Sequence, residues 1–272
     1  MFLRCTEIVL FVLMLVTASF AQNYKRHYEA PFVSDPIAVD GILDEAAWAS
    51  APWMETYILY GTLNGVTTTH TRAKIVWDHE NLYVGVEAID EDIWSTYIHR
   101  DDHLWNEDVV EFFIDPEGDA EGYMEFEVSP RNAVFDAWIE KPLFSQGGPS
   151  HVDWNAAGFH TAVQVEGTLG GKDKDANERK DTDVKWVMEA ALPWEDCAIV
   201  SGQMALPPHP GDTWRMNLTR YDYRKNGFEL SQWSPSDIKG AWHEPKEYGY
   251  VTFVAYTSVG ASSWARMKAV FR

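Results

Sequence analysis

The sequence predicts an all-β fold, an antiparallel β-sandwich with long loops, and three observations support that prediction. Short strand-like segments recur along the chain with turn signals between them, as in sandwiches and barrels. Helical periodicity is weak, and the best helical candidate is a short turn at residues 44–49, which Asp44 could cap. No internal repeat or proline-rich linker divides the 272 residues, so we expect one large β domain.

Nine segments are predicted as strands. The first two are joined by Asp78-His79-Glu80-Asn81, a favourable turn sequence. Two polar loops are expected, 145–150 and the Gly-rich segment 167–183, and the second is predicted as the loop of a long hairpin. The predicted strands are 72–77, 82–89, 109–114, 123–128, 133–139, 159–165, 185–191, 213–221 and 248–255.

The start of the chain has the pattern of a secretory signal peptide. Arg4, the apolar stretch 8–16 and small residues at the −3 and −1 positions before Gln22 predict cleavage and export, to the periplasm or outside the cell. The alternative is an uncleaved N-terminal anchor. No later stretch is apolar for long enough to span a bilayer. The predicted organisation is a signal peptide at 1–21, a lead-in at 22–35, the domain at 36–256 and a poorly ordered tail at 257–272.

The composition restricts the classes of partner. Asp and Glu number 42 against 22 Lys and Arg, a net charge of −20 that disfavours nucleic acid and anionic membranes. The charge is compatible with neutral ligands and with Ca²⁺, although solubility alone explains most of it. Cys5 and Cys197 are the only cysteines, and Cys5 leaves with the signal peptide, so no disulfide framework or cysteine-rich zinc site is expected.

Two neighbouring predicted strands carry carboxylates on a face that also holds large apolar side chains. Strict alternation puts Glu111 on one face of 109–114 and puts Glu125 and Glu127 on one face of 123–128. A carboxylate in such a setting must be hydrogen-bonded or must face a cavity, because its unpaired burial is costly. Acceptors beside flat apolar patches suit a sugar, and the alternative is a solvated outer face. The opposite, core-facing sides are formed by Val110, Phe112, Ile114, Met124, Phe126 and Val128.

Four stretches of the chain together resemble a known family. They are Asp40-Gly41 through Asp44 to Trp48, the hairpin 73–84, the segment 105–116, and the late strand 186–194. In this order they resemble the family 9 carbohydrate-binding modules, a group within the DOMON-like β-sandwiches. The third stretch is the most specific, and the series spans most of the chain that follows the predicted signal peptide.

The resemblance implies a jelly-roll or DOMON-like sandwich in which two aromatic side chains clamp a sugar at a chain end. Trp105 matches the first clamp residue, and Glu111 matches a carboxylate that binds hydroxyl groups. Asp108 lies between them and is expected to support the site. Arg131 and Asn132 fall at a turn where the family often places a polar ligand.

The second clamp residue is expected late in the chain. Trp242 is favoured because it lies closer to the final strand, and Trp233 is the alternative. Several family members bind structural calcium, and no organic cofactor is expected. Asp115 and Glu117 offer oxygen ligands, but an ordinary acidic turn explains them as well, so the sequence assigns no metal ligand. Four other tryptophans are expected in the core, namely Trp48, Trp77, Trp186 and Trp194.

The resemblance implies a secreted, non-catalytic binder of a sugar or glycan chain end, and such a protein is expected to assist polysaccharide breakdown by separate enzymes. One alternative is a glycoside hydrolase, which needs two carboxylates at a fixed separation. A second is a haem-binding DOMON-like redox module, for which Met124, Met188, His103 and His151 are the candidate axial ligands. A third is an interaction module for a partner protein, which the sequence neither supports nor excludes.

Overall fold

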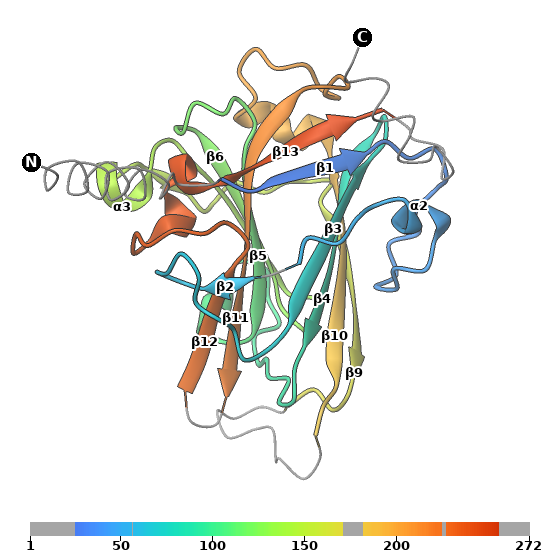
Figure 1. Cartoon of the computed structure of the whole chain (residues 1–272), viewed down its shortest axis with the longest axis vertical. Coiled ribbons are helices and arrows are strands. Elements are labelled where there is room, and N and C mark those ends of the chain that lie inside the picture. Colours follow the sequence, from blue (N-terminus) through green and yellow to red (C-terminus); the bar gives the residue numbers. More distant parts are fainter. Residues whose placement is uncertain (1–24, 56, 171–181, 225–226, 256–272) are drawn as a thin grey trace, which may run out of the picture.

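Two sheets pack face to face and form a β-sandwich, which confirms the predicted fold class (Figure 1). The structure, a computed structural model, describes residues 25–55, 57–170, 182–224 and 227–255. The predicted signal peptide and the predicted tail both lie outside these described residues. None of the described helices has the length and apolar character needed to cross a membrane.

Sheet A is the larger layer and contains nine described strands. Its strands pair antiparallel except for the first, which runs parallel to the last. The order is β1 (His27–Pro31), β13 (Gly249–Val254), β11 (Thr213–Arg224), β5 (Val109–Asp115), β6 (Tyr123–Val128), β7 (Val134–Ile139) and β8 (Ser150–His151), with β12 (Gly227–Gln232) pairing β11 and β2 (Ile58–Leu59) pairing β12.

Sheet B is an antiparallel sheet of four described strands, on the right in Figure 1. Its order is β3 (Thr71–Trp77), β4 (Asn81–Ile89), β10 (Lys185–Pro193) and β9 (His160–Glu166). Strands β9 and β10 pair as neighbours across the predicted hairpin loop. The helical segments are short: α2 (Ala46–Ala49), α3 (Leu143–Gln146), η1 (Leu104–Asn106), η2 (Trp194–Ile199), η3 (Ala241–His243) and η4 (Pro245–Glu247).

All nine predicted strands are present, with ends that differ by a few residues, and four short strands were not predicted. The largest difference is in β11, which runs on to Arg224. Strands β2 and β8 have two residues each, too few for an alternation, whereas β1 and β12 have five and six. All four form where a neighbouring strand offers free backbone groups. The predicted cap is wrong: helix α2 starts after Glu45 without any side-chain cap.

The main core lies between the sheets and is rich in aromatic residues. The six alternating residues predicted to face it on β5 and β6 all do so. Trp214 packs edge-to-face against Phe253 at 4.9 Å and against Trp194 at 5.8 Å, and Trp77 packs against Phe253 at 5.5 Å. Such offset contacts add about 0.5–1.5 kcal/mol each beyond the burial itself.

Glu189 of β10 connects two of the four stretches that carry the family resemblance, the N-terminal stretch that ends at Trp48 and the late strand 186–194. Its carboxylate accepts hydrogen bonds from the backbone N–H groups of Asp40 and Gly41, at 2.9 and 3.0 Å, and from the Trp48 indole at 2.9 Å. Gly41 has a φ of 86°, and a Cβ there would meet the backbone of Gln164 at 2.9 Å. These stretches therefore hold the N-terminal loop on sheet B and shape the fold rather than a ligand site.

Candidate functional site

The outer face of sheet A, on the side away from sheet B, is covered by loops that build a second apolar cluster. Its buried members include Phe113 of β5, Tyr123 of β6, Phe135 of β7 and Tyr248. Segments η1 and η3 bring Trp105 and Trp242 to its edge, where both are half-buried. The predicted mixed face therefore exists, but loops cover it, and it is not a solvated sheet surface.

Trp105 is held by a defined set of contacts at one end of this face. Its ring packs edge-on against Phe135 at 5.5 Å between ring centres and stacks with His103 at 4.6 Å. The Tyr223 hydroxyl donates a 2.9 Å hydrogen bond to the Trp105 carbonyl. The buried Asp108 carboxylate accepts the backbone N–H of Tyr223, and this contact holds the Trp105 segment against β11.

Trp242 lies among aromatic rings on the same face. Its ring centre is 4.4 Å from Tyr60, 6.2 Å from Phe144 and 6.5 Å from Tyr221. The Tyr248 hydroxyl donates to the Trp242 carbonyl, which holds η3 on the cluster. Tyr221 and Tyr223 were not singled out from the sequence, although Thr219, Tyr221 and Tyr223 alternate along one face of β11 and form a readable signal.

Three glutamates form the acidic part of this face. Glu111 on β5 lies opposite Glu127 on β6, and Glu125 is two positions along the same strand. One carboxylate oxygen from each lies within 4.8 Å of the others. The side chains are nearly inaccessible, at 3% exposure for Glu111, 7% for Glu125 and 1% for Glu127. We call these three residues the glutamate cluster.

Burial raises the pKa of every carboxylate in the glutamate cluster. It raises the pKa of Glu111 to about 7, against the hydrogen bond that the Thr219 hydroxyl donates to that carboxylate. Burial and then the charge of Glu111 hold the pKa of Glu125 and of Glu127 well above the usual range, and for Glu127 the charge of Glu125 adds to this rise. The cluster therefore holds protons at pH values where exposed glutamates are ionised.

His243 is the nearest group that could carry a positive charge. Its Nδ1 hydrogen-bonds the Tyr123 hydroxyl at 2.9 Å, and its Nε2 lies 3.9 Å from a Glu125 oxygen. Burial lowers the pKa of His243 to about 4, so the ring is neutral near pH 7. The histidine thus contributes a polar wall to the site and no counter-charge.

The other predicted site residues have different surroundings. Trp233 is 3% exposed and packs in the core between the sheets, where a Cβ on Gly249 would touch its ring at 2.4 Å. Arg131 donates to the carbonyls of Ser95 and Gly170, at 2.6 and 3.0 Å. Asn132 has a φ of 59° and exchanges hydrogen bonds with Thr161. The contacts of these three residues therefore hold loops and core together.

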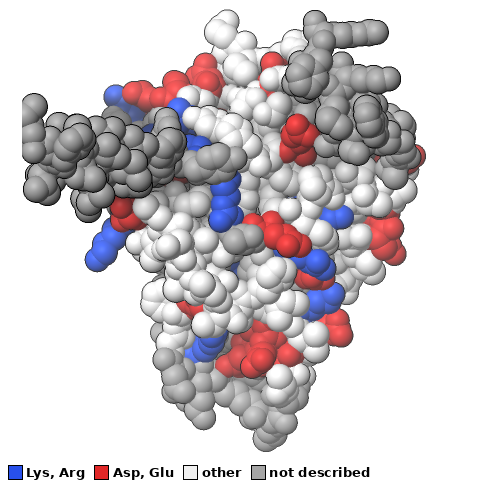
Figure 2. Space-filling model, viewed as in Figure 1, with Lys and Arg blue, Asp and Glu red and all other residues white. Residues whose placement is uncertain are grey.

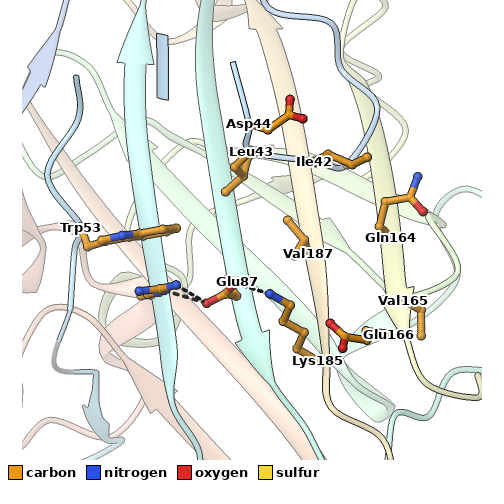
Figure 3. A pocket seen from close by; sticks show the side chains of 12 residues that line it. Ile42, Leu43, Asp44, Trp53, Glu87, Gln164, Val165, Glu166, Lys185 and Val187 are labelled. Carbon is orange, nitrogen blue, oxygen red and sulfur yellow. Dashed lines mark hydrogen bonds and ion pairs between the residues drawn. The ribbon is translucent and has the colours of Figure 1, made fainter. Parts of the chain in front are cut away.

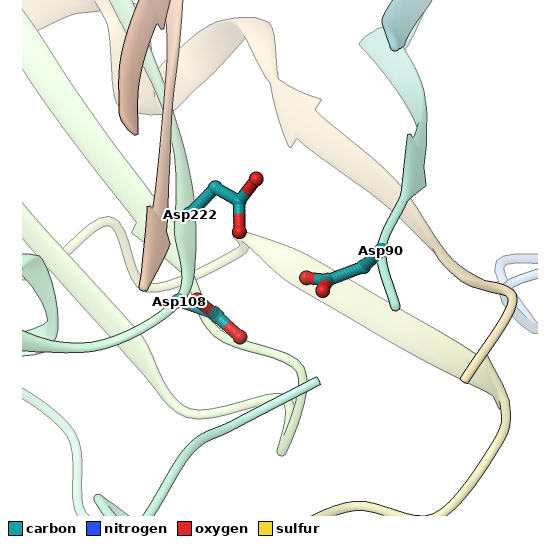
Figure 4. A group of neighbouring side chains, drawn as sticks. All are labelled: Asp90, Asp108 and Asp222. Atoms are coloured by element: carbon teal, nitrogen blue, oxygen red, sulfur yellow. The ribbon is translucent and has the colours of Figure 1, made fainter. Parts of the chain in front are cut away.

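A second acidic cluster lies where β4, β5 and β11 approach one another (Figure 4). Asp90, Asp108 and Asp222 also bring carboxylate oxygens within 4.8 Å of one another. We call these residues the aspartate cluster. Here Arg220, fully buried, donates to Asp90 at 2.8 Å, and Arg224 donates to Asp222. The same Arg220 also donates to the Ile89 carbonyl at 2.7 Å, so the network links the two sheets.

The aspartate cluster does not fit the calcium ion that the family resemblance implies. Calcium takes six to eight oxygen ligands. Both oxygens of Asp108 accept backbone N–H groups, and both oxygens of Asp90 are in use. Only the Oδ1 of Asp222 lacks a partner among the described residues. Asp115, the other possible calcium ligand, likewise uses both carboxylate oxygens to accept the N–H groups of Gly118 and Ala120.

A groove lies on the outer face of sheet B, opposite the aromatic face (Figure 3). It has a volume of about 410 Å³, and its polar wall is an ion-pair series in which Glu87 contacts Arg72 at 2.6 Å and Lys185 at 2.7 Å. Arg72 and Lys74 both lie over the Trp53 ring, at 4.0 and 4.5 Å. The Trp53 ring therefore contacts two of the chain's own cations.

On the face seen in Figure 2, the acidic side chains do not gather in a single patch. Acidic and basic side chains alternate there in small groups. On that face, the net charge of −20 is therefore not gathered into a single binding patch. The chemistry that distinguishes the molecule is in its buried clusters.

The comparisons with known sequences give distant relatives. Endo-1,4-beta-xylanase A of Thermotoga neapolitana is 26% identical over 220 residues, which cover 79% of this chain and 17% of the xylanase. An extracellular protein of Arthroderma benhamiae is 25% identical over 187 residues, 66% of this chain and 73% of that protein. The chain thus spans only a small part of the length of the xylanase that it matches.

The comparisons with solved structures concern the fold. A family 9 carbohydrate-binding module from Caldicellulosiruptor kristjanssonii superposes with a TM-score of 0.57 at 15% identity, covering 87% of this chain and 97% of that module. A protein from Bacteroides uniformis gives 0.62 at 13% identity, covering 85% of this chain and all of that one. The family model described as "Carbohydrate family 9 binding domain-like" matches residues 39–255, and the chain therefore belongs to this family of carbohydrate-binding modules.

Proposed function

We propose that the protein binds a sugar, or the end of a glycan chain, on the outer face of sheet A between Trp105 and Trp242. The observation that carries the proposal is that both half-buried tryptophans edge the apolar cluster from which the glutamate cluster projects. Flat aromatic faces stack on the C–H faces of a sugar ring, and carboxylates accept hydrogen bonds from its hydroxyls. Glu111 is the carboxylate proposed for that second role.

The relatives support a sugar ligand. The Caldicellulosiruptor kristjanssonii module was solved in complex with cellotriose and with glucose. The Thermotoga relatives are xylanases, of which this chain matches a minor part. We therefore propose that the protein is exported and retains or delivers glycan beside separate degrading enzymes.

The geometry favours binding over hydrolysis. A glycoside hydrolase needs two carboxylates on opposite sides of the scissile bond, about 5–9.5 Å apart. Glu111, Glu125 and Glu127 instead lie side by side on two paired strands of one sheet. They are therefore placed as a floor against one side of a ligand.

The haem alternative loses support from burial. Met124 and Met188 are fully buried in the core between the sheets. His151 stacks on Trp138 at 4.1 Å and contacts Glu140 at 2.8 Å, while His103 stacks on Trp105. These four side chains are in use for packing and pairing, so they are poor candidates for axial ligands.

The test is calorimetric titration of the full chain, after any signal peptide is removed, with a panel of mono- and oligosaccharides. Trp105→Ala and Trp242→Ala should each weaken binding by about 1 kcal/mol or more, because each removes a stacking face. Trp53→Ala is the matched control on the outer face of sheet B, and it should leave the affinity unchanged. Repeating the titration with added calcium tests the predicted structural ion.

Absence of binding across the panel, with and without calcium, would reject the proposal. Equal losses of affinity in all three tryptophan variants would also count against it, because they would reflect a general effect on folding. Release of shortened products during the titration would favour the hydrolase instead.

A further inference from the structure

The glutamate cluster lacks the counter-charge that buried carboxylates normally have. Among the described residues, no lysine or arginine forms an ion pair with Glu111, Glu125 or Glu127. The nearest titratable base is His243, which burial keeps neutral near pH 7. The remaining titratable groups facing the cluster are phenols, those of Tyr221, Tyr123, Tyr223 and Tyr248.

The same carboxylates have unused capacity to accept hydrogen bonds. Within the described part of the chain, the Oε2 of Glu127 has no hydrogen-bond partner, although its side chain is 1% exposed. Glu125 accepts no hydrogen bond there either, and its one polar contact is the 3.9 Å approach of His243. Leaving an ionised carboxylate buried and unpaired is costly, so the free protein keeps protons on this cluster, and a cationic donor from outside the chain would let the carboxylates ionise.

An ammonium group matches the number of these acceptors, and their separation is short enough for it to bridge them. It has three N–H donors. With N–H···O contacts of about 2.8 Å, three acceptors around a tetrahedral nitrogen lie about 4.6 Å apart. The cluster offers one oxygen from each of three carboxylates within 4.8 Å of one another. Calcium would need six to eight oxygens, and Glu111 already accepts from Thr219.

The walls of the site also suit a cation attached to a sugar ring. Tryptophan and tyrosine faces attract positive charge as well as apolar surface. The apolar cluster contains Phe113 and Tyr123, which lie on the same strands as the three glutamates. The rings of Trp105, Trp242 and Tyr221 all pack against this cluster. Glu125 is the most exposed of the three glutamates, so it is the one that an arriving ligand meets first.

We propose that the preferred ligand is a sugar that carries a protonated amino group, held by Glu111, Glu125 and Glu127 against the tryptophan walls. This inference rests on the proposed function of the same face and specifies its ligand class. It predicts a preference that neutral glucans and acetylated amino sugars do not satisfy. The acetyl group removes both the charge and two of the donors.

The experiment compares three trisaccharides with the same β-1,4-linked backbone that differ only at carbon 2. They are cellotriose with a hydroxyl, chitotriose with an amine, and triacetylchitotriose with an acetamide. Calorimetry is done at about pH 5.5, because the neighbouring oxygens of an amino sugar lower the pKa of its amine below that of an α-amino group, about 7.7–8.0. We expect chitotriose to bind about tenfold more tightly than either of the others, because its contacts are charge-assisted.

Two isosteric variants test which residues carry that preference. Glu125→Gln and Glu127→Gln keep the side-chain size, and each should reduce the preference for chitotriose to about threefold or less. Glu87→Gln, the same change in the groove on sheet B, is the control and should keep the full preference. Thermal unfolding of each variant shows that the comparison is made on folded protein.

The outcomes separate the ligand class from the function itself. Cellotriose or triacetylchitotriose binding as tightly as chitotriose would overturn the amino-sugar inference and leave the proposed function in place. Tight cellotriose binding only in the presence of calcium chloride would assign the cluster to a metal ion and overturn it as well. No binding of any trisaccharide would count against both the inference and the proposed function.

Discussion

The two buried acidic clusters have the same number of carboxylates, but they differ in the positive charges that surround them. In the aspartate cluster, Arg220 and Arg224 supply two positive charges within hydrogen-bonding reach. In the glutamate cluster, no lysine or arginine of the described chain pairs with any carboxylate. The first cluster is complete within the chain, and the second is incomplete without a ligand.

The pKa values show this contrast only at Asp222, because burial raises the pKa of Asp90 to about 6 and holds that of Asp108 well above its usual range. Burial raises the pKa of Asp222, but hydrogen bonds from Arg224 and the charge of Arg220 outweigh it, so the net pKa is below the usual value. No carboxylate of the glutamate cluster has a lowered pKa. A buried acidic cluster is therefore a candidate ligand site only after the chain's own cations have been counted.

The largest expected effect comes from removing the internal counter-charge. Arg220→Met should destabilise the protein by about 3–5 kcal/mol, because it leaves Asp90 buried without its cation and cuts the link between the sheets. Urea unfolding monitored by tryptophan fluorescence measures the loss. A change below about 1 kcal/mol would show that the aspartate cluster does not depend on Arg220 for its neutralisation.

Removing carboxylates from the glutamate cluster should increase the stability of the protein, in contrast to the loss expected for Arg220→Met. The folded chain binds protons in the glutamate cluster more tightly than the unfolded chain, so this cluster lowers stability as the pH rises from about 4.5 to about 7. The double variant Glu125→Gln/Glu127→Gln removes the part of that cost that comes from Glu125 and Glu127, whose pKa values burial also raises. We expect it to be more stable than the unmodified protein by about 1–3 kcal/mol at neutral pH, since one pKa unit corresponds to about 1.4 kcal/mol.

The pH dependence of that gain is its control. Near pH 4.5 the unmodified glutamates already hold their protons in the folded state, so the two proteins should unfold at similar urea concentrations. Asp90 and Asp115, whose pKa values burial raises to about 6, contribute equally to both proteins and cancel in the difference. A gain that is the same at both pH values would contradict the electrostatic explanation.

The smallest expected effect concerns the outer arginine of the aspartate cluster. Arg224 is partly exposed, and Asp222 keeps Thr69 and Arg220 as neighbours without it. Arg224→Gln should therefore cost about 1 kcal/mol or less and should lose its effect at high salt. A loss as large as that of Arg220→Met would show that the two guanidinium groups act as one unit.

Much of the fold could be predicted from the sequence because it depends on local patterns. The alternation in β5 and β6 placed Phe112 and Phe126 in the core, and the turn at Asp78 joined β3 to β4. Strand β1 could not be predicted in this way, because its five residues gain their partners only from the far end of the chain. The Asp44 cap was wrong because such a short helix is held by packing of Trp48 rather than by its ends.

The sequence by itself determined the β-sandwich, the faces of its central strands and the presence of carboxylates beside aromatic residues. Successive side chains of a strand point to opposite faces, so these features can be recognised from residues that are neighbours in the sequence. The tertiary structure alone decided that Trp233 is a core residue whereas Trp242 edges the aromatic face. It also decided that Arg220 pairs with the aspartate cluster and leaves the glutamate cluster bare. Pairing of charges across distant strands depends on loop paths and register, which no local pattern encodes.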